Sequence, residues 1–122
     1  MVSSSAEIAY DKGYRVKGNS IISPKGSKRA LKLTCHYPKF TVKFQGKAIT
    51  VKCHQLTAWQ KYGRHCIGPD IVVRHVNDDP SDFRAQNIEL GTHEKNVNDR
   101  YINSILQNWI EQINKEASEV PF

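Results

Sequence analysis

The sequence contains no long hydrophobic run: none of its apolar stretches approaches the roughly 20 residues needed to cross a membrane, so a transmembrane protein is not expected. Its first five residues, Met-Val-Ser-Ser-Ser, also lack the apolar segment of a secretory signal. Cysteine is scarce, and its odd count of three argues against a disulfide framework. We therefore expect a reducing, cytoplasmic location and a disordered terminus over residues 1–9.

The arrangement of the cysteines also argues against a structural zinc site. Such sites typically use Cys-x-x-Cys pairs, and the sequence has none. It has instead three adjacent pairs: Cys35-His36, Cys53-His54 and His65-Cys66. Neighbouring residues of a strand point to opposite faces of the sheet, so such a pair cannot easily offer both side chains to one ion. We expect no structural zinc, and we expect the cysteines to lie in the core.

Acidic residues are scarce in the first half of the chain. Up to Arg64 there are two of them against thirteen lysines and arginines, whereas from His65 onward ten acidic residues face five basic ones. The 122 residues suit one domain, and the net charge is +6. A basic half joined to an acidic half predicts a surface that binds a polyanion, beside a site that holds a metal ion or stays solvated. Lysines that only solvate an exposed surface are the alternative.

Two segments after residue 38 alternate between apolar and polar residues, which is typical of a half-buried hairpin. Their apolar faces comprise Phe40, Val42 and Phe44 in the first segment and Ile49, Val51 and Cys53 in the second. Their polar faces carry Thr41, Lys43, Thr50 and Lys52. A β-ribbon with such a face fits the major groove of DNA and contacts its phosphates. An ordinary hairpin with a polar outside explains the pattern equally well.

Helical spacing appears in three later segments, and shorter β-prone pieces precede the hairpin. The pieces "YRV" and "SII" lie between glycines and are predicted to be short strands. Residues 54–63 repeat apolar residues every three positions and end at Gly63, residues 92–100 begin at the capping residue Thr92, and residues 103–117 form an amphipathic helix. This mixture of hairpins and helices predicts the α+β class.

The segment 73–96, "VRHVNDDPSDFRAQNIELGTHEKN", holds the strongest candidate site. A predicted strand ends in His75, a polar loop returns through Asn87, "IEL" forms a second strand, and Asn96 lies about one turn inside the following helix. Hydrolysis of a phosphodiester needs a base that deprotonates water, a cation on the phosphoryl oxygens and a scaffold that holds both. A strand, loop, strand and helix around one metal ion can provide all three.

This segment resembles the HNH, or ββα-metal, motif of nucleases, particularly the branch found in phage and intron-encoded homing endonucleases. "DDPSDFRAQN" and "LGTHEKN" carry the similarity, which "KGYRVKGNSIISPKG" and "GKAITVKCHQLTAW" extend more weakly to roughly residues 10–101. The resemblance implies that His75 is the general base, that Asn96 is a metal ligand, and that Asn87 ties the loop so that His75 keeps its orientation. An ordinary strand-end histidine, a turn asparagine and an exposed helical asparagine are the alternatives.

Two positions depart from the pattern of this family. Many relatives have Asp or His directly before the base, and some have a third histidine four residues after the Asn96 position; this chain has Arg74 and Arg100 there. Arginine cannot coordinate a cation. The resemblance implies Mg²⁺ or Mn²⁺, for which Asn96 alone is a weak site. The ligand set would be completed by the substrate phosphate and by residues among Asp70, Asp78, Asp79, His93 and Asp99. Alternatively, Arg74 and Arg100 bind the phosphate directly.

The sequence thus predicts a small HNH endonuclease that nicks or cleaves double-stranded DNA in a bacterial or phage-infected cell. We expect a basic β-rich DNA-contacting region over residues 10–66, the ββα-metal core over 67–101, and a C-terminal amphipathic helix and tail over 102–122. The predicted DNA-binding residues are Arg15, Lys25, Lys28, Arg29, Lys43, Lys47, Lys52, Arg74 and Arg100. The alternatives are a catalytically inactive DNA-binding module and an accessory protein of a phage assembly. The sequence leaves monomer and homodimer open.

Overall fold

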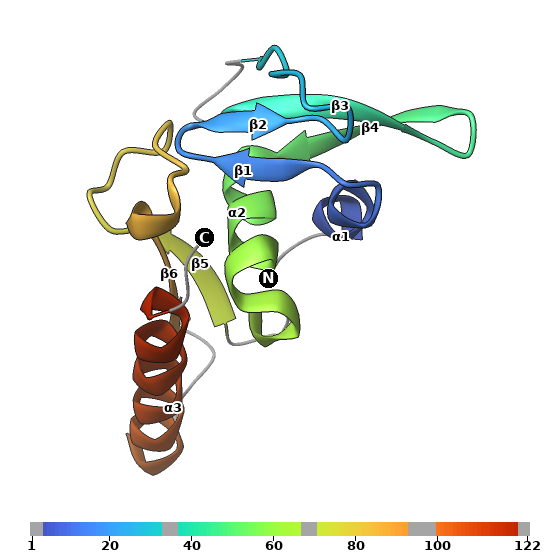
Figure 1. The fold of residues 1–122 in the computed structure, drawn as a ribbon. Coiled ribbons are helices and arrows are strands. Elements are labelled where there is room, and N and C mark those ends of the chain that lie inside the picture. Colours follow the sequence, from blue (N-terminus) through green and yellow to red (C-terminus); the bar gives the residue numbers. More distant parts are fainter. Residues whose placement is uncertain (1–3, 33–36, 67–70, 93–99, 120–122) are drawn as a thin grey trace.

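The computed structural model describes residues 4–32, 37–66, 71–92 and 100–119, in which helices combine with three antiparallel hairpins (Figure 1). The helices are α1 (Ser4–Asp11), α2 (Cys53–Tyr62) and α3 (Arg100–Ser118), with 3-10 turns η1 (Gly63–Cys66) and η2 (Ala85–Asn87). The hairpins pair β1 (Arg15–Lys17) with β2 (Ser20–Ile22), β3 (Lys39–Phe44) with β4 (Lys47–Lys52), and β5 (Ile71–His75) with β6 (Ile88–Thr92). The predicted α+β class is confirmed.

Helix α2 lies at the centre, with the first two hairpins at one end and β5–β6 along its side (Figure 1). Its buried residues are divided between two hydrophobic clusters. The first cluster joins α2 to α1, β5, β6 and α3 and comprises Ala6, Ala58, Tyr62, Cys66, Ile71, Ile88, Leu90, Ile110 and Ile113. The second joins α2 to the first two hairpins and comprises Ala9, Val16, Ile21, Phe40, Val42, Val51, Cys53, Leu56 and Phe83. The two clusters therefore hold the basic region and the β5–β6 hairpin on one helix.

The loop between β5 and β6 is anchored to the second cluster by Phe83, whose side chain is 1% exposed. Its backbone N–H donates to Asn19 Oδ1 over 3.1 Å, and its carbonyl oxygen accepts the Thr57 hydroxyl over 2.6 Å. These two hydrogen bonds fix the β5–β6 loop to Asn19, which precedes β2, and to Thr57 in the middle of α2. Because the loop starts at the end of β5, these contacts also help to hold that end of the strand in place.

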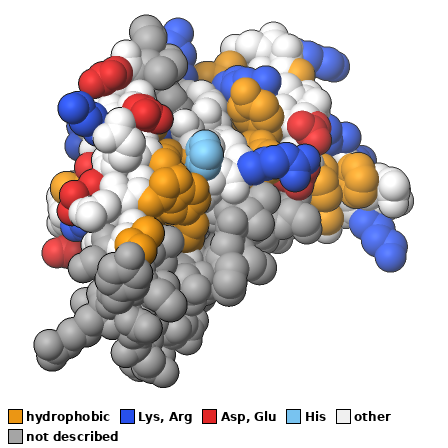
Figure 2. Space-filling model, turned by 90° about the horizontal axis from the view of Figure 1, so that it is seen from below, with side chains coloured by type: hydrophobic (Ala, Val, Ile, Leu, Met, Phe, Trp, Pro, Cys, Tyr) orange, Lys and Arg blue, Asp and Glu red, His pale blue; other side chains and the backbone are white. Residues whose placement is uncertain are grey.

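Helix α3 is attached to β6 by the side chain of Asn114, which hydrogen-bonds to the backbone of Leu90 as a neighbouring strand would. The Leu90 N–H donates to Asn114 Oδ1 and the Asn114 Nδ2 group donates to the Leu90 carbonyl, both over 3.1 Å. Ile110 and Ile113 are buried beside this contact, while Ile105 and Trp109 are exposed hydrophobic residues of the same helix. Hydrophobic side chains also gather beside a histidine on the face drawn in Figure 2. No helix in the described ranges is long and apolar enough to cross a membrane.

Most predicted elements are confirmed, with two corrections. The predicted disordered terminus is wrong from residue 4 onward, because Ser4–Asp11 form α1 and bury Ala6 and Ala9 completely. Phe44 was expected on the buried face of its strand but is 36% exposed, since it lies next to the hairpin turn, beyond the reach of the core. Thr92 ends β6, and the remainder of the predicted helix 92–100 lies outside the described residues, apart from Arg100.

Candidate functional site

An open groove of about 500 Å³ lies at the end of β5. Its lining residues are Tyr37, Val73, Arg74, His75, Asp78 and Pro80. The last three residues of β5 therefore form one wall, and the start of the following loop and Tyr37, which precedes β3, form the rest. The groove brings the predicted base and the arginine beside it to the same concave surface.

His75 is held at the rim of this groove by backbone contacts on both sides. It pairs with Ile88 across the β5–β6 hairpin, and the next residue, Val76, donates its N–H to the Asn87 carbonyl over 2.8 Å. The His75 carbonyl accepts the Asp78 N–H over 3.1 Å, which closes a tight turn. Asp78 has a φ of 60°, a left-handed conformation that aspartate tolerates better than most side chains. The turn fixes the backbone of His75 in place.

The surroundings of His75 keep its imidazole neutral near pH 7. Burial lowers the pKa of His75 below its usual value, and the nearby Asp79 and Asp82 carboxylates oppose this effect only in part. A neutral imidazole has a free lone pair, which a general base requires. The electrostatics thus suit the role that the sequence predicted.

Asn87 closes the loop that follows His75. The side chain is buried, its Oδ1 accepts the Asn77 N–H over 2.9 Å, and its Nδ2 donates to the Asp82 carbonyl over 2.8 Å. Arg84 adds a second tie, because its Nε and Nη2 donate to the two Asp82 carboxylate oxygens over 2.8 and 2.7 Å. This pairing lowers the pKa of Asp82 to about 2. The loop is therefore a closed network of polar contacts around Asn87.

Replacing Asn87 is expected to loosen this loop. Asn87→Ala leaves the Asn77 N–H and the Asp82 carbonyl without their partners, and we expect a loss of about 1–3 kcal/mol of unfolding free energy. Urea denaturation measures the loss, with the exposed neighbour Gln86→Ala as the matched control. Equal stability of the two variants contradicts a structural role for Asn87.

Arg74 lies in the groove with a largely free guanidinium group. It faces Glu89 across the hairpin, but Nη1 and the Glu89 Oε2 are 4.0 Å apart and the Arg74 side chain is 55% exposed. Its Cδ lies against Gly91, where an added Cβ would meet it at 3.3 Å. Such a loose, exposed ion pair contributes little to the stability of the fold. The guanidinium can therefore turn to a phosphate that enters the groove.

The described residues do not by themselves fit a divalent metal ion. They contain no cluster of three His, Cys, Asp or Glu side chains that could hold one. Within the described part of the groove Asp78 is the only carboxylate, and the Asp79 Oδ1 accepts the N–H and hydroxyl of Ser81 over 3.0 and 2.7 Å. The predicted ligand Asn96, the candidates Asp70, His93 and Asp99, and the side chain of Arg100 lie outside the described residues.

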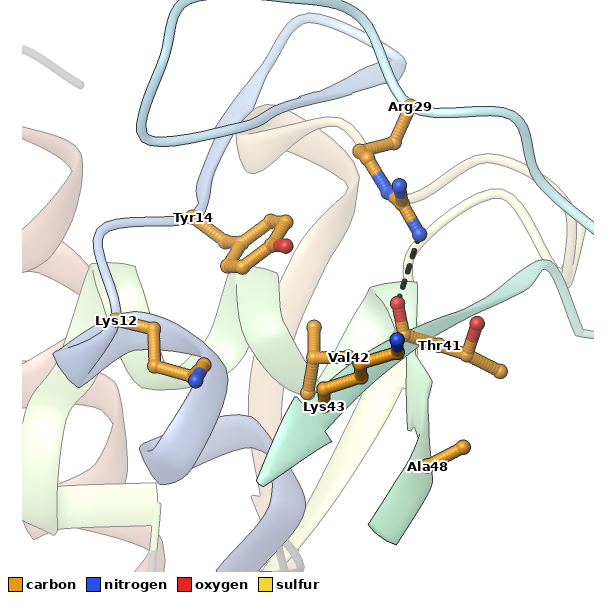
Figure 3. A pocket seen from close by; sticks show the side chains of 7 residues that line it. All are labelled: Lys12, Tyr14, Arg29, Thr41, Val42, Lys43 and Ala48. Atoms are coloured by element: carbon orange, nitrogen blue, oxygen red, sulfur yellow. Dashed lines mark hydrogen bonds between the residues drawn. The ribbon is translucent and has the colours of Figure 1, made fainter. Parts of the chain in front are cut away.

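A second concave surface lies beside β3 and is rich in basic residues (Figure 3). This basic pocket, of about 370 Å³, is lined by Lys12, Tyr14, Arg29, Thr41, Val42, Lys43 and Ala48. The Arg29 Nη2 donates to the Thr41 carbonyl over 2.8 Å, which fixes the guanidinium at the pocket (Figure 3). None of these described lining residues is acidic, so the pocket presents three cations to an incoming anion.

The other predicted DNA-binding residues are distributed around this pocket. Lys25 and Lys28 are exposed in the turn that follows β2, and Lys52 lies on the same outer face of the β3–β4 hairpin as Lys43. Lys47 pairs with Phe44 at the hairpin tip, on the opposite face. Arg15 differs from these residues, because its Nη1 donates to the Tyr10 and Tyr14 carbonyls over 2.8 Å and its guanidinium stacks 3.7 Å above the Tyr10 ring. The Arg15 guanidinium is therefore engaged in contacts within the protein.

Four residues near these two surfaces were not predicted as site residues. Lys12 and Tyr14 line the basic pocket, and Tyr37, which lines the groove, has its ring near those of the buried His54 and of His75. Lys12 belongs to the same basic half of the sequence as most of the predicted DNA-binding residues, and this charge pattern could have identified it. Nothing in the local sequence places Tyr37 or His54 next to His75, because that contact joins three distant elements.

The hairpin β5–β6, its loop and the helix that follows have the ββα arrangement of HNH homing endonucleases. Residues 51–98 match the family model described as HNH endonuclease, which confirms the resemblance seen in the sequence. The match spans α2, both strands of the last hairpin and the loop with Asn87. It therefore includes His75 and the whole described groove except Tyr37.

Among solved structures, the chain is similar to the HNH homing endonuclease I-HmuI, whose structure concerns DNA binding and cleavage. The TM-score is 0.52 at 22% sequence identity, over 84% of this chain. The chain spans 60% of the length of that endonuclease. No curated protein matches the chain. At this level of identity, the likeness shows the fold.

Proposed function

We propose that this chain is a metal-dependent HNH endonuclease that hydrolyses phosphodiester bonds of double-stranded DNA, with His75 as the general base. The observation that carries the proposal is the position of His75 in an open groove, directly beside an exposed arginine. Both lie within the segment that matches HNH endonucleases. In this proposal the protein acts in the cytoplasm and cleaves DNA as a homing-type endonuclease.

The groove residues divide the chemistry between them. The Arg74 guanidinium holds a backbone phosphate by charge-assisted hydrogen bonds and neutralises part of its developing charge. His75 takes a proton from a water molecule, whose oxygen then attacks phosphorus in line with the leaving oxygen. The P–O3′ bond breaks with its electron pair going to O3′, which takes a proton from solvent, so that a 3′-hydroxyl and a 5′-phosphate result. Asn87 holds the loop and so preserves the orientation of His75.

HNH nucleases generally use a divalent metal ion, and we retain Mg²⁺ or Mn²⁺ with Asn96 as a ligand as a prediction. The described residues do not form a complete ligand set for such an ion. Nicking of supercoiled plasmid that EDTA abolishes and Mg²⁺ restores supports this prediction. Nicking that resists EDTA but falls about 10²-fold in Arg74→Gln assigns the metal's electrostatic role to Arg74.

Duplex DNA is bound in this proposal by the basic pocket and the outer face of the β3–β4 hairpin. Each phosphate neutralised by a lysine or arginine releases counterions, so the affinity falls as the salt concentration rises. The pocket places Lys12, Arg29 and Lys43 around one concave surface without an acidic neighbour among its lining residues. This arrangement binds the backbone and not the bases, which predicts little dependence on sequence from these contacts.

Removing two charges of the basic pocket is expected to weaken DNA binding at every sequence. Arg29→Gln combined with Lys43→Gln should reduce the slope of log affinity against log salt by about 2, since roughly one unit is lost per phosphate contact. Fluorescence anisotropy with a labelled duplex at several salt concentrations measures this slope. Lys115→Gln, an exposed charge in the last turn of α3, is the control. An unchanged slope in the double variant removes the pocket from the DNA interface.

The second candidate function is a catalytically inactive DNA-binding module of the same fold. Arg74 favours it, because it stands where many relatives bind their metal ion. In that case wild-type protein binds plasmid without nicking it, and Arg74→Asp gains nicking because it restores an oxygen ligand next to His75. Nicking by the wild type excludes this alternative.

An accessory role in a phage assembly is supported only by the exposed Ile105 and Trp109 of α3. A protein that associates through this surface changes its mass with concentration. Sedimentation of wild type and Trp109→Ala distinguishes self-association from a monomer. It also settles the oligomeric state, which the sequence left open.

A further inference from the structure

The end of the β3–β4 hairpin, which we call the hairpin tip, projects past helix α1 (Figure 1). It comprises residues 43–48, and all of them are exposed. Phe44 pairs with Lys47, and the two residues between them, Gln45 and Gly46, have positive φ angles of 52° and 77°. Two central residues with positive φ are typical of the type I′ turn, whose twist matches that of the flanking strands. The hairpin tip therefore continues the two strands regularly to their end.

Phe44 extends the buried face of β3 beyond the hydrophobic core. Phe40 and Val42 precede it on the same face and are 1% and 3% exposed, whereas Phe44 is 36% exposed. Among the described residues with large, exposed hydrophobic side chains, Phe44 is the one that lies on this hairpin. Single exposed hydrophobic residues are common and do not indicate a function by themselves. The surroundings of Phe44 therefore decide whether it has one.

These surroundings are strongly basic. Residues 39–52 contain four lysines and no acidic residue. Lys47 lies across from Phe44 on the same face of the hairpin, and Lys43 lies on the opposite face, because neighbouring residues of a strand alternate. Each face of the hairpin tip thus carries one ammonium group. An aromatic ring between two such charges is complementary to nucleic acid, whose phosphates are anionic and whose bases stack on aromatic rings.

We propose that the hairpin tip is a wedge for duplex DNA: the Phe44 ring enters between two adjacent base pairs, and Lys43 and Lys47 bind phosphates on either side of it. This proposal rests on the DNA binding of the proposed function and not on cleavage. Proteins that bend DNA insert apolar side chains in this way, which unstacks one base step and kinks the duplex by about 20–90°. The wedge adds a contact with the bases to the backbone contacts of the basic pocket.

The alternative is that the Phe44 ring only lies against the aliphatic part of Lys47 and does not contact DNA. In that case Phe44→Ala changes neither the affinity for DNA nor the shape of the duplex. If the ring enters the duplex, Phe44→Ala lowers the affinity by about 10-fold, which is within the range for the loss of one aromatic ring stacked on a base. The slope of log affinity against log salt stays the same, because Phe44 neutralises no phosphate.

Energy transfer between dyes at the two ends of a short duplex tests the proposal. A free duplex much shorter than the persistence length of about 150 base pairs is nearly straight, so a bend brings the dyes together. We use the full chain in EDTA, which suppresses metal-dependent cleavage. At saturation we expect the wild type to raise the energy transfer, Phe44→Ala to leave it at the value of free DNA, and Phe44→Leu to retain most of the rise, since leucine is also an apolar wedge.

Wild-type protein that saturates the duplex without raising the energy transfer overturns the proposal, and so does Phe44→Ala that bends DNA as the wild type does. Lys47→Gln, at the cross-strand partner of Phe44, separates charge from the wedge. It should reduce the salt slope by about 1 and leave the bend at saturation unchanged. Loss of the bend in this variant at saturation assigns the bend to charge and overturns the role of the ring.

The bend is measured without cleavage, so the two proposals can fail separately. A protein that bends the duplex through Phe44 but never nicks plasmid overturns the endonuclease alone. A protein that nicks plasmid while the bound duplex stays straight overturns the wedge alone.

Discussion

We expect His75→Ala to reduce the rate of DNA cleavage by about 10²–10⁴-fold, the usual contribution of a general base, and to leave the affinity for DNA unchanged. The imidazole is the only neutral base among the described groove residues, so no neighbour can replace it near pH 7. The charges that bind the DNA backbone lie on other elements. Single-turnover cleavage and anisotropy measurements on one duplex separate the two effects.

The exposed His65, which lies in η1 and contacts Trp109, provides the matched control. His65→Ala should cleave DNA at the wild-type rate. The pH profile gives an independent check: burial lowers the pKa of His75, so wild-type activity should persist as the pH falls through 6.5 and decline only below the lowered pKa. A variant that lacks His75 yet cleaves at the wild-type rate excludes this residue as the base.

Phe83→Ala is expected to cost about 3–5 kcal/mol of unfolding free energy, as large-to-small changes at buried aromatic residues do. Phe83 is 1% exposed and carries the β5–β6 loop into the second hydrophobic cluster. The variant loses the ring contacts and leaves a cavity between the loop, β3 and α2. Because the loop begins at His75, we also expect slower cleavage from the fraction that remains folded.

Urea denaturation measures this loss directly, through a lower midpoint at an unchanged slope. Phe44→Ala is the matched control, because Phe44 lies at the hairpin tip and is 36% exposed. We expect a change within about 0.5 kcal/mol for that variant. Equal losses at the two positions contradict the assignment of Phe83 as the anchor of the loop.

The elements that local pattern dictates were predictable from the sequence. The alternation in β3 and β4 and the helical spacing in α2 and α3 each arise from one buried face, which leaves a periodic signature. The segment with His75 and Asn87 was recognisable because its residues are close in the sequence. Both residues lie where the pattern placed them, at the end of β5 and at the return of the loop.

The contacts between distant segments were not predictable in this way. Among the described side chains of α1 only Ala6 and Ala9 are buried, so its sequence carries no strong apolar stripe and does not predict a helix. The exposure of Phe44 depends on where the core ends, which an alternating pattern does not record. Likewise, the packing of Tyr37 and His54 under His75 depends on how α2 meets the end of β5.

The role of Arg74, directly before His75, is to be decided between metal binding and phosphate binding. The sequence identified it as a departure from the metal-binding pattern, and the structure places it in the groove with a weak partner and an exposed guanidinium. A cation that faces the substrate can bind a phosphate, but it cannot bind a metal ion. The arginine therefore makes phosphate binding the role to test at this position.

Conversion of supercoiled plasmid to nicked circles by the purified protein in Mg²⁺ or Mn²⁺ tests the endonuclease assignment most directly. We expect nicked circles that DNA ligase reseals, because hydrolysis at this site leaves a 3′-hydroxyl and a 5′-phosphate. The same preparation of His75→Ala should leave the plasmid supercoiled. Wild-type protein that binds the plasmid but leaves it supercoiled with either ion contradicts the assignment and identifies the chain as a binding module.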